Sequence, residues 1–119
     1  MKNLYISLLL DFYGDMLTDK QKDIIDLYYN DDLSLAEIAQ DCDITRQGVR
    51  DCIKRGEQQL INFEEKLQLA KKFSVIQSNL EKIAQCAKDI DYINGEYNGA
   101  KEIYTKADDI IKLVEEIRE

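Results

Sequence analysis

The sequence of 119 residues contains no histidine, no proline and no tryptophan, and it has only five glycines and three cysteines. The lack of histidine excludes Ser-His-Asp triads, the commonest proton shuttles and most transition-metal sites. The lack of proline leaves long stretches rich in Leu, Ile, Lys, Glu, Gln and Ala uninterrupted, and these residues favour helices. The composition therefore predicts a helical protein that is not an enzyme and has no cofactor.

The three cysteines form no C-x-x-C pair, and their odd number excludes a disulfide scaffold and a zinc ribbon. This use of cysteine is typical of a reducing cytoplasm. An apolar run from Leu4 to Leu10 is too short to span a bilayer, and Asp11 follows it in place of a cleavage site. We therefore expect a soluble, cytoplasmic protein that does not insert into membranes.

The chain is acidic, with 16 basic and 24 acidic residues and a net charge of −8. Residues 34–56 are the least acidic segment, because they carry four residues of each sign. Their four cations fall within ten residues and are Arg46, Arg50, Lys54 and Arg55. Proteins that bind nucleic acid concentrate positive charge on one face, so this segment is the first candidate for function.

Two short helices joined by a tight turn are predicted in the same segment. A capping box, Ser34-Leu-Ala-Glu37, begins the first helix, and Thr45 caps the second just before Arg46. Asp43 stands at the turn position that takes left-handed backbone, which Asp tolerates. The five positions expected to be buried are Ile38, Cys42, Ile44, Val49 and Cys52. The pattern predicts a helix-turn-helix in which both cysteines fill core space and have no redox role.

Helices are also predicted before this motif. An N-terminal helix ends near Gly14, and its apolar stripe is expected to be core, with an interaction face as the alternative. That stripe consists of Leu4, Tyr5, Leu8, Leu9 and Phe12. A capping box at Thr18 begins a second helix that ends in the polar turn 30–32. Its inward-facing residues are predicted to be Ile24, Ile25, Leu27 and Tyr28.

Beyond Gly56 the second motif helix is expected to continue through Ala70. Two further seams, residues 76–90 and 103–117, have apolar spacings of three and four, and turn signals at residues 94–95 and 98–99 separate them. They predict an antiparallel hairpin that buries its own seams, or else a surface that recruits another protein's helix. The expected all-α architecture is thus a helix-turn-helix core domain at 1–73 with a C-terminal helical extension, 74–119, packed on it.

The helix-turn-helix string from Leu35 to Arg50, L-A-E-I-A-Q-D-C-D-I-T-R-Q-G-V-R, resembles region four of bacterial sigma factors, where a similar string reads promoter DNA. With residues 10–21, 27–39 and 67–73, the segment 1–73 resembles the YlxM family of small bacterial helix-turn-helix proteins. That resemblance implies a regulatory role in the signal recognition particle pathway of protein targeting. It also implies that the particle's GTPase, the receptor of the particle or their RNA is the partner, and it supplies no catalytic residues.

Two functions are compatible with the motif. In the first, exposed side chains read DNA, since Arg and Gln pair bidentately with guanine and adenine and Lys contacts phosphate. The candidate residues are Arg46, Gln47, Arg50, Lys54 and Arg55. Asp51 on the same face and the acidic remainder of the chain oppose this function. In the second, which the resemblance favours, the same basic face or the C-terminal hairpin binds the targeting GTPase or its RNA. A homodimer is compatible with either function.

Overall fold

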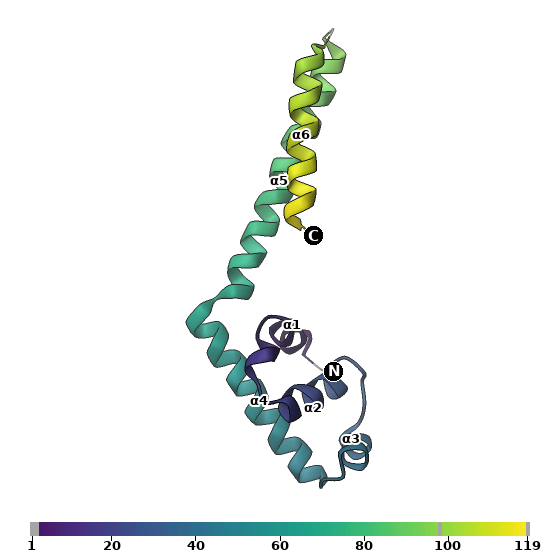
Figure 1. Ribbon diagram of the computed structural model, residues 1–119, viewed down its shortest axis with the longest axis vertical. Helices are drawn as coiled ribbons and strands as arrows, with labels where there is room; N and C mark the ends of the chain where they lie inside the picture. The colour runs from purple at the N-terminus through teal and green to yellow at the C-terminus, as the bar shows by residue number, and fades with distance from the viewer. Residues whose placement is uncertain (1–2, 98, 119) are drawn as a thin grey trace. The chain divides into compact units, whose positions relative to one another are not determined.

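The computed structural model describes residues 3–97 and 99–118, in which no strand occurs, and this confirms the all-α prediction. Its elements are α1 (Leu4–Tyr13), the 3₁₀ turn η1 (Gly14–Met16), α2 (Asp19–Tyr29), α3 (Leu35–Cys42), α4 (Arg46–Leu67), α5 (Leu69–Glu96) and α6 (Lys101–Arg118) (Figure 1). The chain divides into two compact units, Met1–Ala70 and Lys71–Glu119. The turn predicted at residues 98–99 includes Asn98, which lies outside the described residues.

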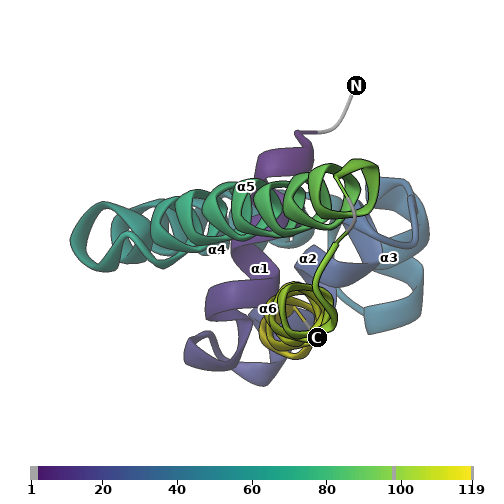
Figure 2. The same cartoon turned by 90° about the horizontal axis from the view of Figure 1, so that it is seen from above.

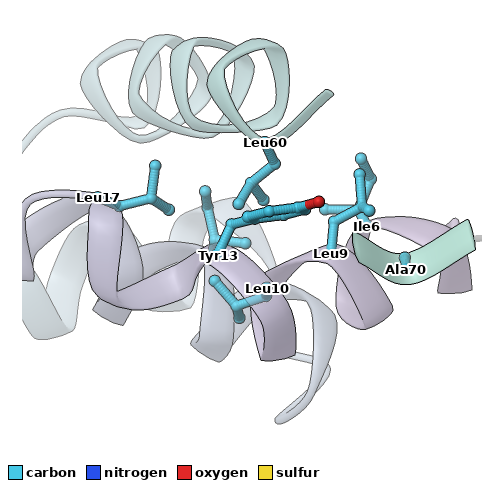
Figure 3. Close-up of a cluster of buried hydrophobic side chains, with 8 residues drawn as sticks. Ile6, Leu9, Leu10, Tyr13, Leu17, Leu60 and Ala70 are labelled. Atoms are coloured by element: carbon cyan, nitrogen blue, oxygen red, sulfur yellow. The ribbon is translucent and has the colours of Figure 1, made fainter. Parts of the chain in front are cut away.

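The N-terminal unit has two apolar cores, of which the first lies between α1, α2 and α4. Figures 1 and 2 together show that α1 crosses α4 steeply. Leu60 points from α4 onto the ring of Tyr13, and both side chains are fully buried (Figure 3). The buried members of this core are Ile6, Leu9, Leu10, Tyr13, Leu17, Ile25, Leu60 and Ala70.

The buried face of α1 differs from the predicted one. Of the predicted stripe only Leu9 is buried, Phe12 is half-buried, and Leu4, Tyr5 and Leu8 are exposed. Most residues of α1 are apolar, so helical spacing alone does not select one side of the helix. Packing against α2 and α4 selects it. The side that they cover carries Ile6, Leu9, Leu10 and Tyr13.

A break at Gln68 separates α4 from α5, so the prediction of one continuous helix through Ala70 is wrong. Gln68 has left-handed backbone, with φ 56° and ψ 31°. The Glu64 carboxylate accepts hydrogen bonds from the Tyr13 hydroxyl at 2.5 Å and from the Ala70 N–H at 3.0 Å. The Tyr13 oxygen in turn accepts from the Leu69 N–H at 3.0 Å. These two side chains satisfy N–H groups that the beginning of a helix leaves free.

The C-terminal unit is a hairpin in which α6 runs back beside the second half of α5 (Figure 1). Arg118 of α6 forms a salt bridge with Glu81 of α5 at 3.7 Å. Although Asn94 and the following glycine were predicted as a turn, α5 continues to Glu96. The Asn94 amide then donates to the Ala100 carbonyl at 2.9 Å and accepts from the Ala100 N–H at 3.0 Å, which fixes the start of α6.

The predicted antiparallel hairpin is present, but it buries only part of each seam. The seam residues that are buried are Leu80, Ala87, Ala107 and Val114. The isoleucines of the same seams are between 37% and 61% exposed, and they are Ile76, Ile83, Ile90, Ile103, Ile110 and Ile117. In a two-helix hairpin each helix has one neighbour, which covers a single stripe, so the rest of each seam remains at the surface.

Two carboxyl groups meet where α5 and α6 pack together, the half-buried Asp91 and the exposed Asp108. Asp91 of α5 hydrogen-bonds with Asp108 of α6, and one oxygen of Asp91 is buried without a hydrogen-bond partner among the described residues. Burial, followed by the charge and hydrogen bond of Asp108, raises the pKa of Asp91. The folded hairpin therefore disfavours the ionised form of Asp91.

We expect Asp91→Asn to raise the melting temperature of the hairpin at pH 7, because it removes the repulsion from Asp108. This gain in melting temperature should shrink as the pH falls from the raised pKa of Asp91 toward the ordinary value of 3.8. In that pH range the Asp91 carboxyl binds a proton in the folded wild type before it does so in the unfolded chain, and this proton binding stabilises the wild type. Thermal melts followed by circular dichroism at several pH values measure the effect. Asp89→Asn, the same change at an exposed position of α5, is the control. Equal shifts for both variants would contradict the prediction.

Candidate nucleic-acid interface

The turn between α3 and α4 has the geometry of a helix-turn-helix. Ser34 and Glu37 form the predicted capping box, with two reciprocal bonds of 3.1 Å. Asp43 adopts the predicted left-handed backbone, with φ 54° and ψ 47°. Thr45 Oγ1 accepts a hydrogen bond from the Gly48 N–H at 2.9 Å, so the predicted cap of α4 is confirmed. These contacts determine where both motif helices begin.

The second core of the N-terminal unit sets the rotation of α4 about its axis. Its buried members are Ile24, Ile38, Ala39, Val49 and Ile53. Three positions predicted as buried, Cys42, Ile44 and Cys52, pack against this core but remain half-buried. Burial raises the pKa of the Cys52 thiol, which keeps it protonated at neutral pH and agrees with a packing role. Because Val49 and Ile53 face inward, the opposite side of α4 faces solvent.

Four of the five predicted site residues form one exposed row, which we call the basic stripe, along a flank of α4 next to its buried face. Its members are Arg46, Gln47, Arg50 and Lys54. The three cations recur every four residues, so they are spaced by about 6 Å along the helix axis. Within residues 3–97 and 99–118, none of these cations forms a salt bridge with an acidic side chain. The stripe is therefore open to an anionic partner.

Arg55, the fifth predicted residue, is exposed but lies apart from the basic stripe. It follows Arg46 by nine residues, which places it about half a turn away around the helix. Its positive charge instead acts to lower the pKa of the Cys52 thiol, as does that of Lys20 at the start of α2, but the effect of burial is larger. A single partner on the basic stripe would leave Arg55 uncovered.

Asp51 lies at the edge of the basic stripe and affects both the hydrogen bonding of Gln47 and the charge of this surface. The Gln47 side-chain amide donates a hydrogen bond to the Asp51 carboxylate at 2.9 Å, and both residues are exposed. Pairing with adenine requires both a donor and the acceptor of a glutamine amide, and here Asp51 engages one of the two amide N–H groups. Its negative charge also opposes an approaching anion. Asp51 therefore weakens Gln47 as a base-reading residue.

The beginning of α3, which the sequence analysis did not include in the site, lies beside the stripe. Ser34, Leu35 and Ala36 line a shallow depression together with Arg46 and Arg50. Free N–H groups at the beginning of a helix carry partial positive charge and favour anions. The S-L-A-E capping box was the sequence signal for this helix start, but only the fold places it next to the arginines.

Aromatic side chains flank the other end of the stripe. Tyr28 and Tyr29, whose rings meet edge to face at 5.1 Å, line a second depression with Arg50 and Lys54. The Tyr29 hydroxyl donates to the Glu57 carboxylate, and burial, followed by this bond, raises the pKa of Tyr29. Aromatic rings beside cations are a surface on which unpaired RNA bases stack.

No group of three or more His, Cys, Asp or Glu side chains in the described part of the chain could hold a metal ion. None of the described helices is both long enough and apolar enough to cross a membrane.

Comparison of the sequence with known proteins shows the family to which it is similar. Residues 1–98 match the model of UPF0122, the YlxM/p13-like helix-turn-helix proteins. A UPF0122 protein of Caldanaerobacter subterraneus is 51% identical over 83 residues, which are 70% of this chain and 71% of the relative. One of Desulforamulus reducens is 44% identical over 115 residues, 96% of this chain and 93% of the relative. One of Bacillus cereus is 42% identical over 107 residues, 90% of this chain and 97% of the relative.

Proposed function

The chain belongs to the UPF0122 family of YlxM/p13-like helix-turn-helix proteins, and from this premise we propose that it is a non-enzymatic regulator that binds RNA through the basic stripe. We further propose that it acts in the signal recognition particle pathway, on the RNA of the particle and its associated GTPase. The basic stripe is the observation that carries this proposal. It aligns three cations beside a helix start and two tyrosines.

The charge of the N-terminal unit favours RNA loops over duplex DNA as the target. Residues 1–70 carry eight basic and 14 acidic residues, so the stripe is a small positive region on an acidic unit. Three phosphate contacts on a DNA duplex would give a salt slope of only about −2.7, which is shallow for a specific DNA-binding protein. Recognition of RNA loops adds base stacking on aromatic side chains and so needs fewer phosphate contacts.

The pathway is supported by the resemblance of residues 1–73 to the YlxM family, for which regulation of protein targeting is the proposed role. The acidic remainder of the chain is compatible with this pathway as well. A basic RNA-binding GTPase and an acidic regulator attract each other at long range, which accelerates their encounter.

We expect the protein to bind the RNA of the signal recognition particle, alone or assembled with its GTPase. The double variant Arg46→Ala/Arg50→Ala should bind about 15-fold more weakly at 0.15 M salt, because each lost contact with a single-stranded phosphate costs roughly fourfold. Fluorescence anisotropy of labelled RNA at several salt concentrations measures both the affinity and the salt slope. Steady-state GTP turnover of the particle and its receptor measures regulation in the same samples.

Arg55→Ala is the matched control, since it removes the same charge from the other side of α4 and should leave the affinity unchanged. Asp51→Asn should strengthen binding, because it removes the negative charge beside the stripe and weakens the hold on Gln47. If Arg55→Ala weakens binding as much as Arg50→Ala, the basic stripe is not the interface. If no targeting component binds while a defined DNA duplex binds at physiological salt, the protein is a transcription regulator.

A further inference from the structure

The hairpin of α5 and α6 has a small core for its length. The buried cluster that joins the two helices consists of Leu80, Ala84 and Val114. Two further residues of the hairpin, Ala87 and Ala107, are buried, but their small side chains contribute little apolar area. Apolar burial is the main source of stability for packed helices, so this hairpin lacks much of the burial that a stable unit needs.

Each helix of the hairpin carries a second apolar row that the unit covers only in part. On α5 this outer row consists of Ile76, Ile83, Ile90, Ile93 and Tyr97, which are between 45% and 80% exposed. On α6 it consists of Ile103, Ile110, Leu113 and Ile117, which are between 37% and 61% exposed. The spacings within both rows are sums of three and four residues, as in helices that pack against two neighbours in a bundle.

The two outer rows lie on the same side of the hairpin. Ile90 of α5 and both Ile103 and Ile110 of α6 line one open groove. An adjoining depression is lined by Ile90, Ile93, Tyr97 and Ile103. The groove is therefore built from both helices, so an occupant would pack against α5 and α6 at once.

We propose that the occupant of this groove is the same hairpin of a second copy of the chain, so that two hairpins form an antiparallel four-helix bundle. The outer row of α5 is about 30 Å long and that of α6 about 20 Å, and helices are at least 10 Å wide. Each copy would thus cover about 500 Å², and the total of about 1,000 Å² reaches the lower bound for a specific interface.

The charges of the hairpin favour a second copy over a highly charged partner. Residues 71–118 carry eight basic and nine acidic residues, so two hairpins meet without net repulsion, in contrast to the acidic N-terminal unit. A contact between the outer rows of two copies brings the same surface together twice, as a two-fold interface requires.

The first test is the oligomeric state of the purified full-length chain. We expect sedimentation equilibrium to give twice the chain mass of 13.8 kDa. Ile110→Glu and Ile83→Glu should each give the monomer mass, since they place a carboxylate in the groove. Tyr92→Glu, at a position of α5 that is 71% exposed and outside the outer row, should leave the dimer intact. A monomeric wild type, a dimer that survives both groove variants, or a dimer lost equally in Tyr92→Glu would each overturn the proposal.

A second test uses the wild-type chain and does not depend on how a variant folds. Cys86 is exposed and lies between Ile83 and Ile90 along the outer row, whereas Cys42 and Cys52 are half-buried in the other unit. Pairing of the hairpins should cover Cys86. We expect its alkylation by a bulky maleimide, located by mass spectrometry, to slow as the protein concentration rises through the dissociation constant. A rate that does not change with concentration would overturn the proposal.

Discussion

Val49→Asp is expected to unfold the N-terminal unit. Val49 is completely buried in the second core, among apolar side chains of α2, α3 and α4. An aspartate there must bury an unpaired carboxylate or hold it protonated, and either state costs several kcal/mol. The total stability of a small domain is ~5–15 kcal/mol, so most of it would be lost.

Arg50→Asp provides the matched control for this prediction. It introduces the same side chain at the next position of α4, which is exposed, so it should change stability by only about 0.5 kcal/mol. Chemical denaturation followed by circular dichroism measures both variants. If Val49→Asp keeps the wild-type midpoint, the inward face of α4 has been assigned to the wrong residues.

Glu64→Ala is expected to destabilise the same unit by about 2–6 kcal/mol, because the Tyr13 hydroxyl and the Ala70 N–H each lose a buried hydrogen bond worth about 1–3 kcal/mol. The left-handed backbone at Gln68 would also lose the contacts that hold it. Amide hydrogen exchange should therefore show faster exchange at Leu69 and Ala70 in the variant. Urea denaturation measures the loss of stability.

Glu65→Ala is the control for Glu64→Ala, since it removes the neighbouring carboxylate, which is exposed, and should cost at most about 0.5 kcal/mol. A double-mutant cycle with Tyr13→Phe and Glu64→Gln separates the pair from its surroundings. We expect a coupling free energy of about 0.5–3 kcal/mol, the range for residues in one hydrogen-bond network. Additive effects of the two changes would mean that the two side chains do not act together.

The rotation of α4 about its own axis determines which residues form the proposed interface, and the number of cations on the helix does not. Arg50 and Arg55 are both exposed arginines of one helix, yet only Arg50 lies beside the start of α3 and the tyrosines. Helical spacing separates the two residues once the inward face is known. That face is set by Val49 and Ile53. Core packing thus selects the residues that a nucleic acid can contact together.

Features set by neighbouring residues were predictable from the sequence. The caps at Thr18, Ser34 and Thr45 and the left-handed turn at Asp43 depend on hydrogen bonds within a few residues, so the local sequence determines them. The helix-turn-helix and its exposed cations follow from these caps and from helical spacing. The family resemblance of residues 1–73 rests on the same local strings, and the match of the family model confirms it.

Only the tertiary structure decided which apolar face each helix buries and where the long helix breaks. The break at Gln68 depends on a bond between Tyr13 and Glu64, which are 51 residues apart, and no glycine or proline marks it. On α1 and on both hairpin helices, apolar residues occupy more than one side, so spacing is equally compatible with several buried faces. The neighbouring helices choose among these faces, because a side chain is buried only where another element covers it.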